Sequence, residues 1–204
     1  MSPRATAMSA DERRKAIVQA VVPLLAERGS DLSTREIAEA AGIAEGTIFR
    51  VFEDKRALMI AAAKEAINPQ SGEELFAEAM LEHPDLRGKV VAAAERVQER
   101  MRLTMAVMVA VRVHLMAEHH HDRDHHKHPG PPRFVLEAQE ALNERLTTLF
   151  EPHRDELAIE PAQAAVALRS LVFGASRPEL GMKAVLTPDQ IADVLLHGVL
   201  KRED

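Results

Sequence analysis

Residues 33–62 read STREIAEAAGIAEGTIFRVFEDKRALMIAA, and this stretch decides the fold of the chain. Its apolar residues recur every three or four positions, which is the period of an amphipathic helix and not of a strand. Ser33 followed by Glu36 fits the S-x-x-E capping box, which starts a helix. The stretch therefore predicts helices, beginning with a short one over residues 34–40.

A glycine divides this stretch into separate helices. Residues 41–43, Ala-Gly-Ile, predict a tight turn because Gly42 can adopt the left-handed conformation that other residues avoid. After the turn we expect a second short helix over about residues 44–51 and a longer one over about residues 54–67. Two short helices joined by a glycine turn indicate a helix-turn-helix, in which the second helix crosses the first steeply.

The faces of these helices differ in chemistry. Six residues have the spacing of a three-helix core, namely Ile37, Ala38, Ala41, Ile43, Ile48 and Phe52. Four residues at the start of the second short helix are expected to point outward, namely Glu45, Gly46, Thr47 and Arg50. A glycine inside a helix costs on the order of 1 kcal/mol relative to alanine. Such a cost makes sense where the backbone must come close to a DNA surface.

The outward-facing side chains suit contact with DNA. Thr47 can bond a phosphate or touch a thymine methyl group, and Arg50 can fork onto a guanine or bind a phosphate. Thr34 and Arg35 begin the preceding helix, where free amide donors favour a phosphate, and Lys55 does the same at the start of the next helix. The alternative is a three-helix protein-interaction module whose charged side chains are merely solvated.

Residues 13–62 as a whole resemble the DNA-binding domain of the TetR family of bacterial transcriptional regulators. The resemblance rests on a first helix ending at Gly29 and on Ile37-Ala38, Ala41-Gly42-Ile43, Gly46-Thr47-Ile48-Phe49, Phe52, Lys55 and Leu58. It implies a dimer whose recognition helices enter successive major grooves of a near-palindromic operator, with a helical C-terminal domain that binds an effector and dimerises. Two positions depart from the family pattern. Ala44 replaces the usual capping Ser or Thr, and Phe49 replaces the usual Tyr, so one phosphate-binding hydroxyl is missing.

Helical patterning continues through the other parts of the 204-residue chain. We expect an all-α protein of about nine helices, the first over residues 9–28, with a helix-turn-helix domain at 1–67 and an effector-binding and dimerisation domain at 74–204. The chain has no cysteines, which excludes disulfides and thiolate metal sites. No apolar run approaches the roughly 20 residues of a membrane span, and the polar start lacks the core of a signal peptide. A cytoplasmic location without membrane contact is therefore predicted.

Charge is distributed unevenly along the chain. The formal net charge is −6, yet residues 1–67 carry as many basic as acidic side chains, so residues 68–204 hold the whole acidic excess. Bulk charge does not by itself predict a DNA partner. A DNA-binding face needs only a local cluster of positive charge and donors, and the N-terminal third is the less acidic part.

A long helix is expected from about Lys89 to Glu118, at the centre of the C-terminal domain. Its methionines can repack around varied apolar ligands, and its polar residues can orient a ligand. The candidate residues for binding a small-molecule effector are Met101, Met105, Met108 and Arg112. The alternative is that the methionines are ordinary core residues and that the polar side chains are solvated.

The last two helices are expected over about residues 161–176 and 188–201. By resemblance to the family, they pair with their copies in a second chain to form a four-helix dimer interface. The candidate interface residues are Leu168, Leu171, Val172, Ala175, Ile191, Val194 and Leu195. The alternative is packing within one chain alone.

Residues 119–128 read HHHDRDHHKH, which raises the possibility of a metal or pH sensor. His121 and His125 have an i, i+4 spacing, and with His119 they are the candidate metal ligands. Such spacings arise by chance in a tract this rich in histidine, and a solvated loop between helices is the alternative. No enzyme site is predicted, because the tract lacks the glutamate general base of a zincin motif, and no cofactor is expected.

These patterns, together with the resemblance to the TetR family, imply a ligand-responsive DNA-binding regulator, which in such families is most often a repressor. It would bind a near-palindromic operator as a homodimer and release it when a small-molecule effector binds. The alternative is a metal-binding helical protein, a metal or pH sensor through its histidine-rich loop, with the N-terminal module as an interaction domain.

Overall fold

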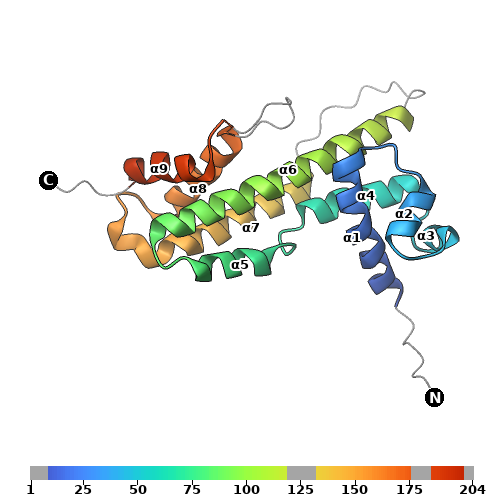
Figure 1. The fold of residues 1–204 in the computed structure, drawn as a ribbon, viewed down its shortest axis with the longest axis horizontal. Helices are drawn as coiled ribbons and strands as arrows, with labels where there is room; N and C mark the ends of the chain where they lie inside the picture. Colours follow the sequence, from blue (N-terminus) through green and yellow to red (C-terminus); the bar gives the residue numbers. More distant parts are fainter. Residues whose placement is uncertain (1–8, 119–131, 176–184, 200–204) are drawn as a thin grey trace, which may run out of the picture. The chain divides into compact units, whose positions relative to one another are not determined.

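The computed structural model describes residues 9–118, 132–175 and 185–199. These residues form α-helices and one 3-10 helix, and none of them lies in a β-strand, as the sequence predicts. Figure 1 shows the helices in the order of the chain. None of the described helices is both long and apolar enough to cross a membrane. The histidine-rich tract lies outside the described residues.

The chain divides into two compact units. Of the described residues, one unit holds 9–66 and 106–118, and the other holds 67–105, 132–175 and 185–199. The helix α6 (Leu86–Glu118) contributes to both units. The first segment ends near the border that the sequence predicts after residue 67, but the contribution of residues 106–118 to the first unit is not predicted. Each unit is described separately below.

Four helices of the first unit follow closely on one another. They are α1 (Ala10–Arg28), α2 (Thr34–Ala40), α3 (Glu45–Val51) and α4 (Lys55–Ile67), within a residue or so of the predicted bounds. Capping boxes start the first two of these helices: Ser9 exchanges hydrogen bonds with Glu12, and Ser33 does so with Glu36, the second as predicted. Asp54 caps α4 by accepting the backbone N–H of Ala57 at 2.6 Å.

The core of this unit is made by apolar side chains from all four helices and the loop before α2. Its largest fully buried residues are Ile17, Leu25, Leu32, Ile37, Ile48, Phe52, Leu58 and Met59. Four of the six predicted core residues are buried there, namely Ile37, Ala38, Ile48 and Phe52. Ala41 and Ile43 are half-buried instead, because both lie in the turn after α2.

The second unit contains α5 (Glu73–Glu82), the first part of α6, α7 (Arg133–Phe150), a 3-10 helix (Glu151–Glu156), α8 (Pro161–Ala175) and α9 (Pro188–Val199). Within it α7 packs on α8, and α8 packs on α9. Thr187 caps the last helix, since its Oγ1 accepts the N–H of Gln190 at 3.2 Å. The core of this unit includes Phe76, Val90, Leu146, Phe150, Leu168, Val172, Ile191 and Leu195.

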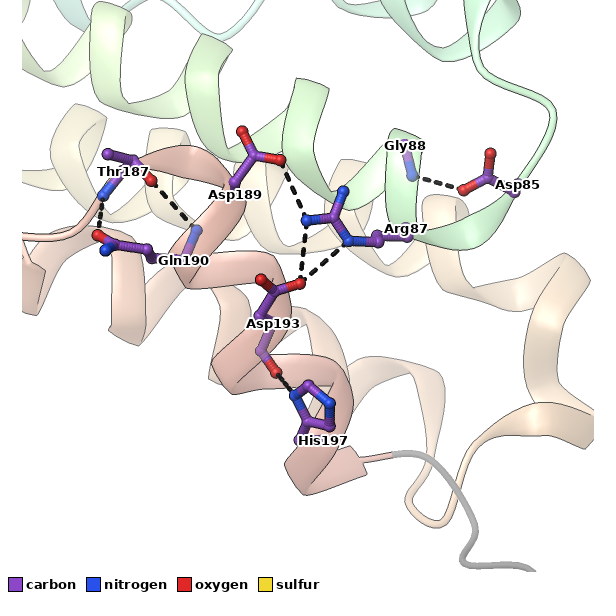
Figure 2. Close-up of polar contacts among 8 residues, drawn as sticks. All are labelled: Asp85, Arg87, Gly88, Thr187, Asp189, Gln190, Asp193 and His197. Carbon is purple, nitrogen blue, oxygen red and sulfur yellow. Dashed lines mark hydrogen bonds and ion pairs between the residues drawn. The ribbon is translucent and has the colours of Figure 1, made fainter.

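An exposed arginine joins the start of α6 to α9. Figure 2 shows the guanidinium of Arg87 between two carboxylates, with Nε 3.0 Å from Asp193 and a terminal nitrogen 3.1 Å from Asp189. These hydrogen bonds, the one to Asp193 first, raise the pKa of Arg87 above its ordinary value. Because all three side chains are about half exposed, the network orients α9 and adds little to stability.

Candidate nucleic-acid interface

A glycine turn sets the angle between α2 and α3. Gly42 has a φ of +65°, a conformation that costs glycine nothing. The N–H of Ile43 donates to Ala38 O at 2.9 Å, and the N–H of Gly42 donates to Glu39 O at 3.1 Å. This pair of bonds is the Schellman motif, which satisfies the last carbonyls of α2. The turn lets α3 pack against both α2 and α1.

The helix α3 has one buried side and one open side. Ile48 is fully buried, whereas Glu45, Gly46, Phe49 and Arg50 are exposed and Thr47 is half-buried. The ring of Phe49 remains 50% exposed, an unusual position for a large apolar side chain without a partner. The residues predicted to point outward therefore form one open surface on a helix that is anchored by its other side.

Gly46 has no packing reason inside the protein. A Cβ atom placed on Gly46 would have no neighbour within 4 Å, so an alanine would fit without displacing anything. Glycine nevertheless weakens a helix by on the order of 1 kcal/mol relative to alanine. The backbone of α3 is therefore open on the side where a Cβ atom of residue 46 would stand.

The N-terminus of α3 lacks a side-chain cap. Ala44 occupies the N-cap position in an extended conformation, and only its carbonyl takes part, accepting the N–H of Thr47 at 2.8 Å. A serine or threonine at this position would supply an acceptor worth about 1 kcal/mol. The structure therefore confirms that α3 starts without a side-chain cap, as Ala44 predicts.

The other predicted DNA contacts lie at the starts of the neighbouring helices. Thr34 is the first residue of α2 and is half-buried, Arg35 follows it and is exposed, and Lys55 is the first residue of α4. One contact here is not predicted: the Thr34 hydroxyl donates to the carboxylate of Glu45 on α3. Because the two residues are 11 positions apart, no local pattern reports this contact.

Two arginines of α1 contact α2, α3 and the residue after α3. Arg28 lies 2.6 Å from Glu36, the acid of the α2 capping box. The Ser33 backbone and hydroxyl, with help from Arg28, lower the pKa of Glu36 from 4.5 to about 2. Arg14 donates to Val51 O at 3.2 Å, and its guanidinium stands 4.3 Å from the ring centre of Phe52. Sequence analysis does not single out Arg14, since a charged residue on the exposed side of a helix usually contacts only water.

A family comparison agrees with this geometry. The model of the tetR family of bacterial regulatory proteins matches residues 17–62, which run from α1 through α2 and α3 into α4. The helix-turn-helix unit of the chain is therefore of the TetR type. The helix-turn-helix and the helical C-terminal part of the chain correspond to the two halves of a TetR-type regulator, as the resemblance implies.

Solved structures share the whole TetR fold with this chain. A protein from Saccharomonospora viridis, described as a transcriptional regulator in complex with choline, has a TM-score of 0.62 and 18% identity over 94% of this chain and 100% of that chain. A TetR transcriptional regulator from Streptomyces coelicolor has a TM-score of 0.56 and 20% identity over 92% and 98%. The superantigen PfiT has a TM-score of 0.58 and 19% identity over 96% and 100%. Identities this low show a common fold and no common ligand. None of the curated proteins matches the chain.

Two of the predicted effector residues line a hollow. Met108 and Arg112 on α6 surround a space of about 450 Å³ with Arg56, Val111, Leu115 and Met116. All six residues belong to the first unit. Met101 is buried and Met105 is half-buried, and neither lines this hollow, so the predicted set of four is not brought together there.

Most of the predicted dimer residues lie in the core of a single chain. Leu168, Val172, Ala175, Ile191 and Leu195 are all buried within a single chain, where they form part of the core of the second unit. Leu171 is half-buried, and among the seven only Val194 is exposed. The apolar side chains that remain open on α8 are instead Val166 and Phe173. Periodicity alone does not distinguish these sides of α8, because apolar residues occur on both.

The predicted metal ligands His119, His121 and His125 lie outside the described residues. Within the described parts of the chain, no three His, Asp or Glu side chains gather closely enough to hold a metal ion. The described residues therefore give the metal hypothesis no support.

Proposed function

We propose that the chain is a ligand-responsive transcriptional regulator that binds a near-palindromic operator as a homodimer. The open surface of α3 carries this proposal. Its backbone can approach DNA at Gly46, its Arg50 can bind a guanine or a phosphate, and Phe49 can contact a thymine methyl group. The backbone amides at Thr34 and Arg35, with the side chains of Arg35, Thr47 and Lys55, supply further donors around it. We place the protein in the cytoplasm, where its operator would be found.

The proposed mechanism is a population shift. A small organic molecule binds the dimer state whose recognition helices do not match the one-turn spacing of the operator half-sites, so the DNA is released. Repression relieved by the effector follows from this mechanism. A protein of the same fold was solved with choline, which supports binding of a small molecule by such folds. Four of the six residues that line the hollow are Met, Val or Leu and the other two are Arg, so we propose a largely apolar effector.

Fluorescence anisotropy tests the proposal. Purified protein is titrated onto labelled DNA from upstream of its own gene, at two salt concentrations. We expect saturable binding that weakens as salt rises, because bound arginine and lysine side chains release counterions from phosphates. Arg50→Ala should weaken this binding about ten-fold or more.

Arg133→Ala is the charge-matched control. Arg133 is an exposed arginine on α7 of the second unit, 2.7 Å from Glu137, so its removal should leave operator affinity unchanged. Binding that ignores both salt and Arg50 would contradict the proposal and would favour an interaction module instead.

A further inference from the structure

Glu45 is an acidic residue in the middle of a surface that we assign to DNA. It is the first residue of α3, it is exposed, and it lies beside Gly46 and three positions before Ile48, which anchors the helix. Phosphates repel a carboxylate, so Glu45 weakens DNA binding unless it meets a hydrogen-bond donor there. Its place on this surface therefore calls for a specific partner.

The partner that suits a carboxylate best is cytosine. In the major groove guanine presents two acceptors, and thymine presents an acceptor and a methyl group, so neither can donate to Glu45. Cytosine and adenine each present an amino group, but adenine places the N7 acceptor next to it. That nitrogen would repel the second carboxylate oxygen, whereas cytosine has only a C–H group at the neighbouring position.

Thr34 fixes the orientation of this carboxylate. Its hydroxyl donates to Oε1 of Glu45 across the turn between α2 and α3, which leaves Oε2 as an acceptor for another donor. A carboxylate held at one oxygen loses less side-chain freedom when the second oxygen binds. The contact therefore prepares Glu45 to accept a single directed hydrogen bond.

We propose that Glu45 reads a cytosine in each operator half-site by accepting a hydrogen bond from its N4 amino group, and that Thr34 is its positioning residue. This proposal rests on the proposed function. A purely structural role is the competing explanation, since an acidic residue in the first turn also favours a helix electrostatically. That role affects the stability of α3 and gives no base preference.

The test is selection of operators from a random DNA pool by the full chain and by Glu45→Gln. Glutamine pairs with adenine through N6 and N7. We therefore expect one position in each half-site to change from cytosine to adenine. Anisotropy on the two matched operators should then show about a ten-fold preference that reverses between the proteins, in line with the usual cost of one mismatched pair.

Variants of Thr34 test the positioning role. Thr34→Val keeps the shape but removes the hydroxyl, so it should reduce the cytosine preference several-fold, while Thr34→Ser should retain it. An operator whose bases are identical for the wild-type chain and Glu45→Gln overturns this inference and leaves the proposed function standing. A wild-type chain that enriches no sequence at all overturns the proposed function itself.

Discussion

Single residues in the first unit determine where α2 begins and ends and leave one side of α3 open. Gly42 closes α2 with a positive φ, Gly46 keeps α3 open to close approach, and Ser33 with Glu36 starts α2. Of these, Glu36 has a measurable signature in pH. Its pKa is about 2 in the folded chain, against an ordinary value of 4.5.

The ionised Glu36 should stabilise the fold only above acidic pH. Because its folded pKa lies below its unfolded pKa, the unfolded chain binds more protons between them, and stability falls as pH falls. The contribution is complete above pH 4.5 and is lost as pH drops to about 2. Urea unfolding of the wild-type chain and Glu36→Gln should therefore show a gap in midpoint at pH 7 that closes toward pH 2. A gap of constant size across this range would mean that the charge of Glu36 is not what the capping box uses.

Helix ends are where the sequence is most informative at the scale of elements. Ser9, Ser33 and Thr187 each lie directly before the first residue of a helix. Their capping bonds join residues three positions apart, so the sequence alone can indicate them. The contact between Thr34 and Glu45 is not predictable in this way, since it depends on the angle that the Gly42 turn imposes on two helices. Local signals predict elements, and the contacts between elements need the fold.

The start of α3 can be stabilised by a substitution at its N-cap. Ala44→Ser would place a hydroxyl acceptor at the N-cap, where the backbone is already extended, within reach of the N–H groups of Gly46 or Thr47. We expect about 1 kcal/mol of added local stability, seen as slower hydrogen exchange in α3.

Ala44→Val is the matched control for this experiment. It adds bulk at the same position without an acceptor, so exchange in α3 should not slow. If valine protects α3 as well as serine does, apolar contact and not capping is responsible.

At the scale of the whole molecule, the sequence predicts the buried and exposed sides of a helix in one unit but not in the other. On α3, the helical period separates the buried Ile48 from the exposed Glu45, Gly46 and Arg50. The core side and the open side of α8 are not separated, because Leu168 and Val172 are buried while Val166 and Phe173 are exposed. Choosing between two apolar sides requires knowing where α7 and α9 lie.

If the proposed dimer forms through the exposed side of α8, substitutions on its exposed and buried sides should have different effects. Phe173→Glu should give a folded monomer in analytical ultracentrifugation and weakened operator binding, because a charge would replace an exposed apolar contact at the interface. Leu168→Ala should instead destabilise the fold by about 2–5 kcal/mol, since Leu168 is fully buried. A dimer that persists in Phe173→Glu would place the interface on another surface.

The closed core of the second unit also bears on how such regulators diverge. The helices α8 and α9 bury Leu168, Val172, Ile191 and Leu195 within one chain. The exposed Val166, Phe173 and Val194 can therefore be substituted with little effect on the stability of the folded chain. After a gene duplication, these three positions could change to unlike pairs while both copies still fold. Two sister regulators in one cell could thereby stop forming mixed dimers through a few outward substitutions, each keeping its own operator.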